Sequence, residues 1–100
     1  EKATKEATIV PLSVLERCLD AVLLAREIAR IGNKNSISDA GVAGLMARAA
    51  ALGAYYNVLI NLPGIRDENF NTDTRKKAES LREKVEEQAD FVAAFIKSKL

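Results

Sequence analysis

The chain contains no histidine and only one cysteine, Cys18, among its 100 residues. A lone cysteine cannot form an internal disulfide, and without histidine the chain alone builds neither an ordinary zinc site nor a histidine base. We therefore predict no metal site. Any acid or base chemistry within this chain must come from Asp, Glu, Lys, Tyr or Cys. Cys18 lies among apolar neighbours, which is typical of an inert core thiol.

The chain also lacks an excess of charge of either sign. Fifteen Lys and Arg residues face fourteen Asp and Glu residues, which gives a net charge of +1. In the last third of the chain, glutamates interleave the lysines throughout "KKAESLREKVEE" and would repel phosphate, so we predict no nucleic-acid partner. No secretory signal opens the sequence, and we expect a cytoplasmic protein.

A membrane span is the next class to exclude. Residues 37–62 are long enough and mostly apolar, but they contain Asp39, Arg48 and two asparagines, and polar groups are costly in hydrocarbon. We therefore predict a buried central helix and no membrane partner. With 48% hydrophobic and 29% charged residues, the composition is that of one ordinary globular domain. The opening "EKATKEATIV" reads as a helix already under way, so we expect further residues upstream.

Three helical stretches account for most of the sequence. In the first, Gly32 is expected to end the helix as a left-handed C-cap, and Pro11 is expected to begin or kink it. The apolar face of this stretch recurs at steps of three and four residues, through Ile9, Leu12, Leu15, Leu19, Val22, Leu23 and Ile28.

The second stretch is rich in Ala and Gly. Ser36 and Asp39 resemble a capping box, which predicts a helix beginning at about Ile37. Pro63 is expected to end this helix by moving Leu62 out of helical geometry. Side chains as small as these allow a helix, a second subunit or a flat ligand to approach the backbone.

The third stretch runs from about Thr72 to Lys99 and is charged on one side and apolar on the other, as in a long amphipathic helix. Together the three stretches predict an all-α fold, an antiparallel helical bundle of about three long helices. A bundle of this size buries a modest core, so we expect it to be half of a larger helical domain or to pack on a second subunit.

Asn57 and Asn61 in "YYNVLINL" are the first candidate site residues. Positions four apart face nearly the same way on a helix, so the two amides are directed to one place. Each amide offers both donors and acceptors, which suits a flat heterocycle with alternating N–H and C=O groups. The same amides can equally satisfy loop carbonyls or pair across a helix interface, and the spacing leaves both alternatives open.

A second set of polar residues lies around the start of the second helix. Asp39 is the one candidate for a catalytic group, but the helix dipole would keep it ionised and make it a poor proton donor, and its position also fits a capping residue. Asn33 fits a loop residue, although an exposed amide beside a cleft can also bind a ligand. We therefore assign no catalytic residue from the sequence.

Four segments in order, "ATIVPL", "GNKNSISDAGVA", "GAYYNVLINL" and "IRDENF", resemble the cyclodeaminase/cyclohydrolase family, which includes the cyclodeaminase domain of formiminotransferase-cyclodeaminase. The segments run from Ala7 to Phe70, and the long helix that follows fits the end of that domain. Each segment alone is weak, whereas the ordered set is fairly specific.

The resemblance implies an all-helical, dimer-forming domain that acts on tetrahydrofolate derivatives and needs no further cofactor. Family members close 5-formiminotetrahydrofolate with loss of ammonia, or interconvert the methenyl and 10-formyl forms by adding water. Asn33, Ser38, Asp39, Asn57 and Asn61 match polar positions of the family, and this match implies that they bind the folate substrate.

The chain also departs from the family pattern. The family domain is about twice this long, and its earlier half carries a glycine-rich segment and an aspartate implicated in acid-base catalysis, neither of which this sequence contains. The resemblance thus implies that residues 1–100 are the C-terminal half of the domain, which needs a missing N-terminal half as partner and is inactive alone.

A different class of function also fits. The chain can be a non-catalytic helical dimerisation or interaction module, in which the Ala/Gly-rich helix is a protein-protein surface. The sequence does not distinguish a deaminase from a cyclohydrolase, nor does it tell whether a formiminotransferase domain is attached.

Overall fold

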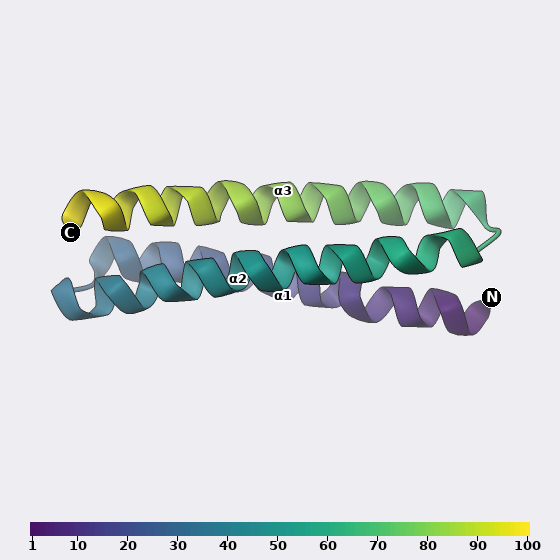
Figure 1. The fold of residues 1–100 in the computed structure, drawn as a ribbon, viewed down its shortest axis with the longest axis horizontal. Helices are drawn as coiled ribbons and strands as arrows, with labels where there is room; N and C mark the ends of the chain where they lie inside the picture. Colours follow the sequence, from purple (N-terminus) through teal and green to yellow (C-terminus); the bar gives the residue numbers. More distant parts are fainter.

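Three long helices alternate in direction along the chain, each antiparallel to the one before it, in the computed structural model, which describes residues 1–100 (Figure 1). Helix α1 comprises Lys2–Ile31, α2 comprises Lys34–Asn61, and α3 comprises Glu68–Lys99, with a short 3-10 helix, η1, at Leu62–Gly64. The bundle measures 51 × 17 × 16 Å. The predicted all-α bundle of three helices is therefore confirmed, and the segment "NVLINL" is helical.

Small side chains allow α2 to pack closely between its two neighbours. Its buried positions are Ala and Gly except for one valine, namely Ala40, Gly44, Ala47, Ala51, Ala54 and Val58. A Cβ atom added at Gly44 would lie 3.3 Å from the Val92 side chain on α3. This contact is tighter than ordinary packing, so glycine at this position sets how closely α2 and α3 approach.

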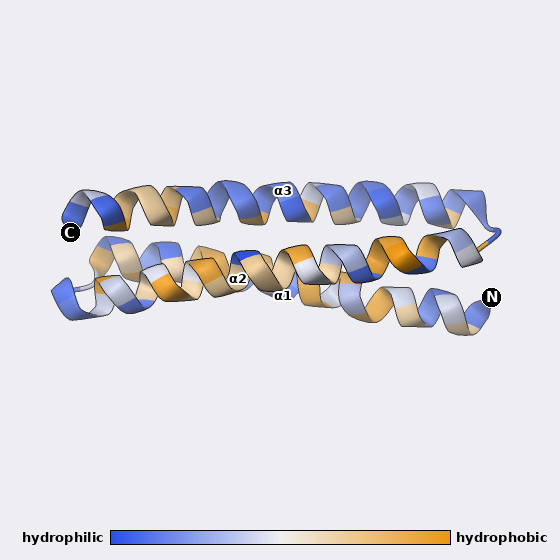
Figure 2. Cartoon of the chain, in the orientation of Figure 1, coloured by the Kyte–Doolittle hydropathy of each residue, from blue (hydrophilic) through white to orange (hydrophobic).

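The core is a narrow line of side chains between the three helices. Leu15, Val22, Val58 and Val85 are completely buried, and Cys18 lies with them at 7% exposure. Only 20 of the 100 residues are buried, which is few for a domain that must bury most of its apolar surface to be stable. Figure 2 shows extended hydrophobic stretches on α2 and a mainly hydrophilic α3. No helix combines the length and the apolar character needed to cross a membrane.

The structure corrects the expected boundary between α1 and α2. Gly32 ends α1 with extended backbone, φ −75° and ψ 162°, and so is not a left-handed cap. Glycine is required here for space, because a Cβ would lie 2.4 Å from the Ser36 hydroxyl oxygen and 2.5 Å from the Ile28 carbonyl oxygen. Pro11 does not begin α1 but lies inside it.

The ends of α2 and the start of α3 also differ from expectation. Helix α2 ends at Asn61, but Leu62 keeps right-handed helical angles, φ −61° and ψ −41°, because the chain continues directly into η1. Helix α3 starts at Glu68, four residues before the predicted Thr72. The earlier start follows from Asp67, whose carboxylate accepts a hydrogen bond from the Phe70 amide at 3.0 Å and caps the helix.

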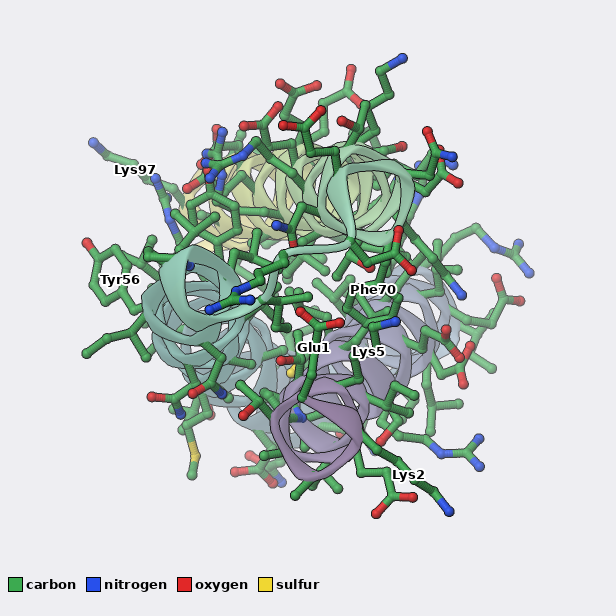
Figure 3. All side chains as sticks on the ribbon, turned by 90° about the vertical axis from the view of Figure 1, so that its right-hand side faces the viewer. Glu1, Lys2, Lys5, Tyr56, Phe70 and Lys97 are labelled. Atoms are coloured by element: carbon green, nitrogen blue, oxygen red, sulfur yellow. The ribbon has the colours of Figure 1, made fainter.

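A polar contact joins the start of α1 to the start of α3. The Lys5 ammonium group lies 2.8 Å from the Asp67 carboxylate and 5.3 Å from the centre of the Phe70 ring. The Glu1 carboxylate accepts a hydrogen bond from the Arg66 amide. Figure 3 looks onto this end and shows Glu1 and Lys5 directed between the helix ends, whereas Lys2 points outward. The hydrogen bond from Lys5 lowers the pKa of Asp67, and the Phe70 amide adds to this effect.

Asp67 therefore predicts an acid-sensitive contribution to stability. The pKa of Asp67 in the folded state is lower than its ordinary value of 3.8. The stabilisation is therefore fully present at pH values well above 3.8, and it is lost as the pH falls through the folded-state pKa. Asp67→Asn keeps a capping oxygen but removes the charge. We expect the variant to be less stable than the wild type at pH 7 and to lose less stability between pH 5 and acid conditions, measured by urea unfolding of the complete gene product. Parallel pH profiles for the two proteins would contradict this role.

Candidate ligand groove between the first two helices

A long apolar groove lies between α1 and α2. It consists of three hollows joined end to end, because Val14 and Ala50 line both the first and the middle hollow, while Ala21 and Ala43 line both the middle and the last. Several large apolar side chains stay exposed along it, including Val10, Val14, Leu24, Ile28, Met46 and Ile60. Exposed apolar surface of this extent is typical of a binding or assembly surface.

The two asparagines of "NVLINL" lie together at one end of this groove. Asn57 and Asn61 both line the first hollow, which has a volume of about 640 Å³. The Asn61 side-chain N–H donates to the Asn57 backbone carbonyl oxygen at 3.2 Å. The Asn61 side-chain oxygen and the whole Asn57 carboxamide make no hydrogen bond within the chain. The two asparagines thus line one hollow, as their four-residue spacing predicts.

The wall opposite the asparagines comes from α1. Ala7, Val10, Pro11 and Val14 line the same hollow. None of its lining residues is ionisable, so this part of the groove is shaped for an uncharged, mainly apolar group with a few polar atoms. The segment "ATIVPL" belongs to the family resemblance, but nothing in the sequence alone places it opposite the asparagines; its one signal is a proline inside an amphipathic helix.

The other predicted site residues lie at the far end of the bundle. Asn57 follows Asn33 by 24 positions along α2, which is about 36 Å at 1.5 Å per residue. One small ligand cannot span that distance within a single chain. The structure thus divides the five predicted residues into two sets, with Asn57 and Asn61 in one and Asn33, Ser38 and Asp39 in the other.

Asn33 starts α2, and the expected capping box of Ser36 and Asp39 is wrong. The Asn33 side-chain oxygen accepts hydrogen bonds from the Asn35 amide at 3.0 Å and the Ser36 amide at 3.1 Å. The helix therefore begins at Lys34, three residues earlier than predicted. Asp39 is a helix-interior residue and not a cap.

Ser38 and Asp39 point to different sides of α2, because consecutive residues of a helix are rotated by about 100°. Asp39 lines the last hollow of the α1–α2 groove beside Ala25 and Ile28. Ser38 lies in a separate hollow between α2 and α3, near Gly41 and Lys97, and its hydroxyl donates to the Asn35 carbonyl oxygen at 3.3 Å. Only Asp39 of this pair shares a groove with the asparagines.

The groove offers no obvious reactive group. Cys18 lines the middle hollow, but its thiol is largely buried, and burial raises its pKa, so the thiolate is disfavoured. No group of three or more His, Cys, Asp and Glu side chains gathers anywhere in the chain as a metal site would require. Two amides edge the first hollow, and Asp39 in the last hollow is the one carboxylate that lines the groove.

The fold and the groove define an all-helical domain with an amide-edged apolar groove, and comparison with known proteins identifies its family. The sequence matches the family described as Formiminotransferase-cyclodeaminase over residues 1–80. The chain belongs to this family.

Individual relatives cover nearly the whole chain. It is 37% identical over 100 residues to a methenyltetrahydrofolate cyclohydrolase of Methylorubrum extorquens, covering all of this chain and 48% of that protein. It is 31% identical over 99 residues to a formimidoyltransferase-cyclodeaminase of Rattus norvegicus, covering 99% of this chain and 18% of that protein. The pig protein of the same name is 33% identical over 92 residues. The chain thus spans about half the length of the cyclohydrolase and less than a fifth of the rat protein.

Capping predicts how Asn33 responds to substitution. Asn33→Ala removes the side-chain acceptor for two amides, and we expect it to lower the free energy of unfolding by about 1 kcal/mol. Asn33→Asp retains that acceptor at a helix N-terminus and should be close to wild type. Thermal unfolding of the complete gene product measures both. If the alanine variant is as stable as the aspartate variant, the capping role is contradicted.

Proposed function

We propose that this chain is the folate-binding C-terminal half of an enzyme of tetrahydrofolate one-carbon metabolism, a formiminotetrahydrofolate cyclodeaminase or a methenyltetrahydrofolate cyclohydrolase. The observation that carries the proposal is the pair of amides, Asn57 and Asn61, on the edge of an uncharged apolar hollow. Membership of the formiminotransferase-cyclodeaminase family and the names of the relatives support the choice of ligand.

In this proposal the substrate enters the groove with its flat pterin ring against the apolar wall of α1. The unpaired Asn57 carboxamide then donates to a ring oxygen or nitrogen and accepts from a ring N–H, which fixes the ring in its plane. The first hollow contains no charged side chain, so it suits the neutral ring better than the carboxylates of the folate tail, which would lack a counter-charge there.

The reaction itself needs a proton donor or a general base. In the deaminase reaction the second folate nitrogen bonds to the formimino carbon and loses its proton, while the former imino nitrogen takes up a proton and leaves as ammonia. In the cyclohydrolase reaction water adds to the methenyl carbon, and the bond from that carbon to one ring nitrogen breaks. Both steps require a group that titrates near neutral pH. None lines the hollow beside Asn57, so we assign binding and orientation to this chain and proton transfer to the remainder of the domain.

A second copy of the chain would unite the two separated sets of polar residues. The α1–α2 face can pack against the same face of a partner about a two-fold axis that lies in the interface and crosses the helices near their middle. Asp39 of one copy then approaches Asn57 of the other, and each dimer has two composite sites. The exposed apolar side chains along the groove favour such an interface, which we propose as the homodimer contact.

Substrate turnover tests the proposed enzyme. The complete gene product should consume 5,10-methenyltetrahydrofolate or 5-formiminotetrahydrofolate, followed by absorbance, and Asn57→Ala should lower kcat/KM by about ten-fold or more, because it removes at least one ring hydrogen bond. Glu83→Ala on exposed α3 is the matched control and should be unaffected. If the complete protein leaves both folates unchanged, the enzyme proposal fails and the non-catalytic interaction module becomes the better account.

Mixing two variants tests the composite site. Asn57→Ala and Asp39→Ala damage different halves of each site. When equal amounts are unfolded and refolded together, about half of the dimers carry one copy of each and have one intact site. Activity should then recover to about a quarter of the wild type, well above either variant alone. If activity stays at the level of the separate variants, the site is built within one chain, or Asp39 does not contribute to it.

A further inference from the structure

Pro11 leaves one backbone carbonyl of α1 without its helical partner. In an α-helix each amide N–H donates to the carbonyl oxygen four residues earlier, and proline has no N–H. Pro11 lies inside α1, so the carbonyl oxygen of Ala7 receives no bond from that position. The neighbouring hydroxyl groups do not replace it, because Thr8 donates to the Thr4 carbonyl and Ser13 donates to the Val10 carbonyl.

Ala7, the residue whose carbonyl lacks the bond from position 11, belongs to the wall of the hollow that contains the asparagines. Ala7 and Pro11 line this hollow from α1, while Asn57 and Asn61 line it from α2. Two helices therefore bring unused hydrogen-bonding groups to one place. The Asn57 carboxamide supplies donors and an acceptor, the Asn61 side-chain oxygen supplies an acceptor, and the backbone of Ala7 supplies another.

The position of the proline is otherwise unfavourable. Proline is the least favourable residue for a helix interior, and Pro11 lies within a helix of 30 residues. An alanine at position 11 would complete the helical hydrogen bonds. Residues that lower stability in this way are concentrated where a protein binds or reacts.

We infer that the Ala7 carbonyl is a ligand-binding acceptor, exposed by Pro11, and that it accepts a hydrogen bond from a ring N–H of a neutral flat heterocycle held on its other side by Asn57. The inference rests on the proposed function, in which this heterocycle is the pterin ring. The amide-like edge of a pterin offers two N–H donors beside a C=O acceptor. One asparagine carboxamide can accept only one of these N–H groups while it donates to the C=O. The second N–H needs another acceptor, and the Ala7 carbonyl is that acceptor.

Two replacements at position 11 test this assignment in the complete gene product. Pro11→Ala introduces an N–H that occupies the Ala7 carbonyl. Lactic acid at position 11, incorporated as a backbone ester, has the same side chain as alanine but no N–H, and so leaves that carbonyl free. Comparing the two separates the hydrogen bond from the shape of the proline ring, which both replacements remove.

We expect Pro11→Ala to raise the Tm and to weaken binding of 5,10-methenyltetrahydrofolate by about ten-fold, the usual effect of one lost hydrogen bond. The ester variant should bind within about three-fold of the wild type. In protein labelled with ¹³C at the alanine carbonyls, the Ala7 signal should shift when the folate binds to the wild type but not when it binds to Pro11→Ala.

Other results would overturn the assignment. Equal binding by the wild type and Pro11→Ala, without a ligand-dependent shift of the Ala7 signal, shows that the carbonyl is not used. Equal weakening by alanine and by the ester shows that the proline ring matters and the carbonyl does not. Failure of the proposed function gives a result different from these two, because the wild type itself would then bind no folate. In that case the pterin ring would also be the wrong ligand for the Ala7 carbonyl.

Discussion

The close approach of α2 to its neighbours is the constraint on which the rest of the structure depends. Alanine and glycine at its buried positions allow the backbones to come together, and Gly44 against Val92 marks one limit of this approach. Small residues fill little volume, so the core is narrow and much apolar surface stays on the outside. The groove between α1 and α2 is the direct result, because Ala43, Ala50 and Gly53 give it a floor close to the backbone.

Helical periodicity was sufficient to predict the three helices and their antiparallel order, since long amphipathic patterns are strong signals. The helix ends were less predictable. Asn33 and Ser36 are both good capping residues, and nothing local decides between them. The choice depends on the turn at Gly32, where a Cβ would collide with Ser36 and Ile28. Glycine was expected there for its backbone angles, whereas the structure requires it for its lack of volume.

The candidate site was partly accessible from the sequence. A four-residue spacing brings Asn57 and Asn61 to one face of a helix, and the structure bears this out. Two features needed the tertiary arrangement. The distance between the asparagines and Asp39 follows only once α2 is one unbroken helix, and the Pro11 segment faces Asn57 because the turn between α1 and α2 is only two residues long. Ala7 and Asn57 lie at almost equal distances along their helices from that turn.

A crystal structure of the complete gene product with 5-formyltetrahydrofolate, a stable substrate analogue, tests the central claim most directly. Our account predicts the pterin ring in the hollow between α1 and α2, with ring atoms about 3 Å from the Asn57 carboxamide, within hydrogen-bonding distance. A pterin ring bound elsewhere would contradict the account and leave the two asparagines as structural residues.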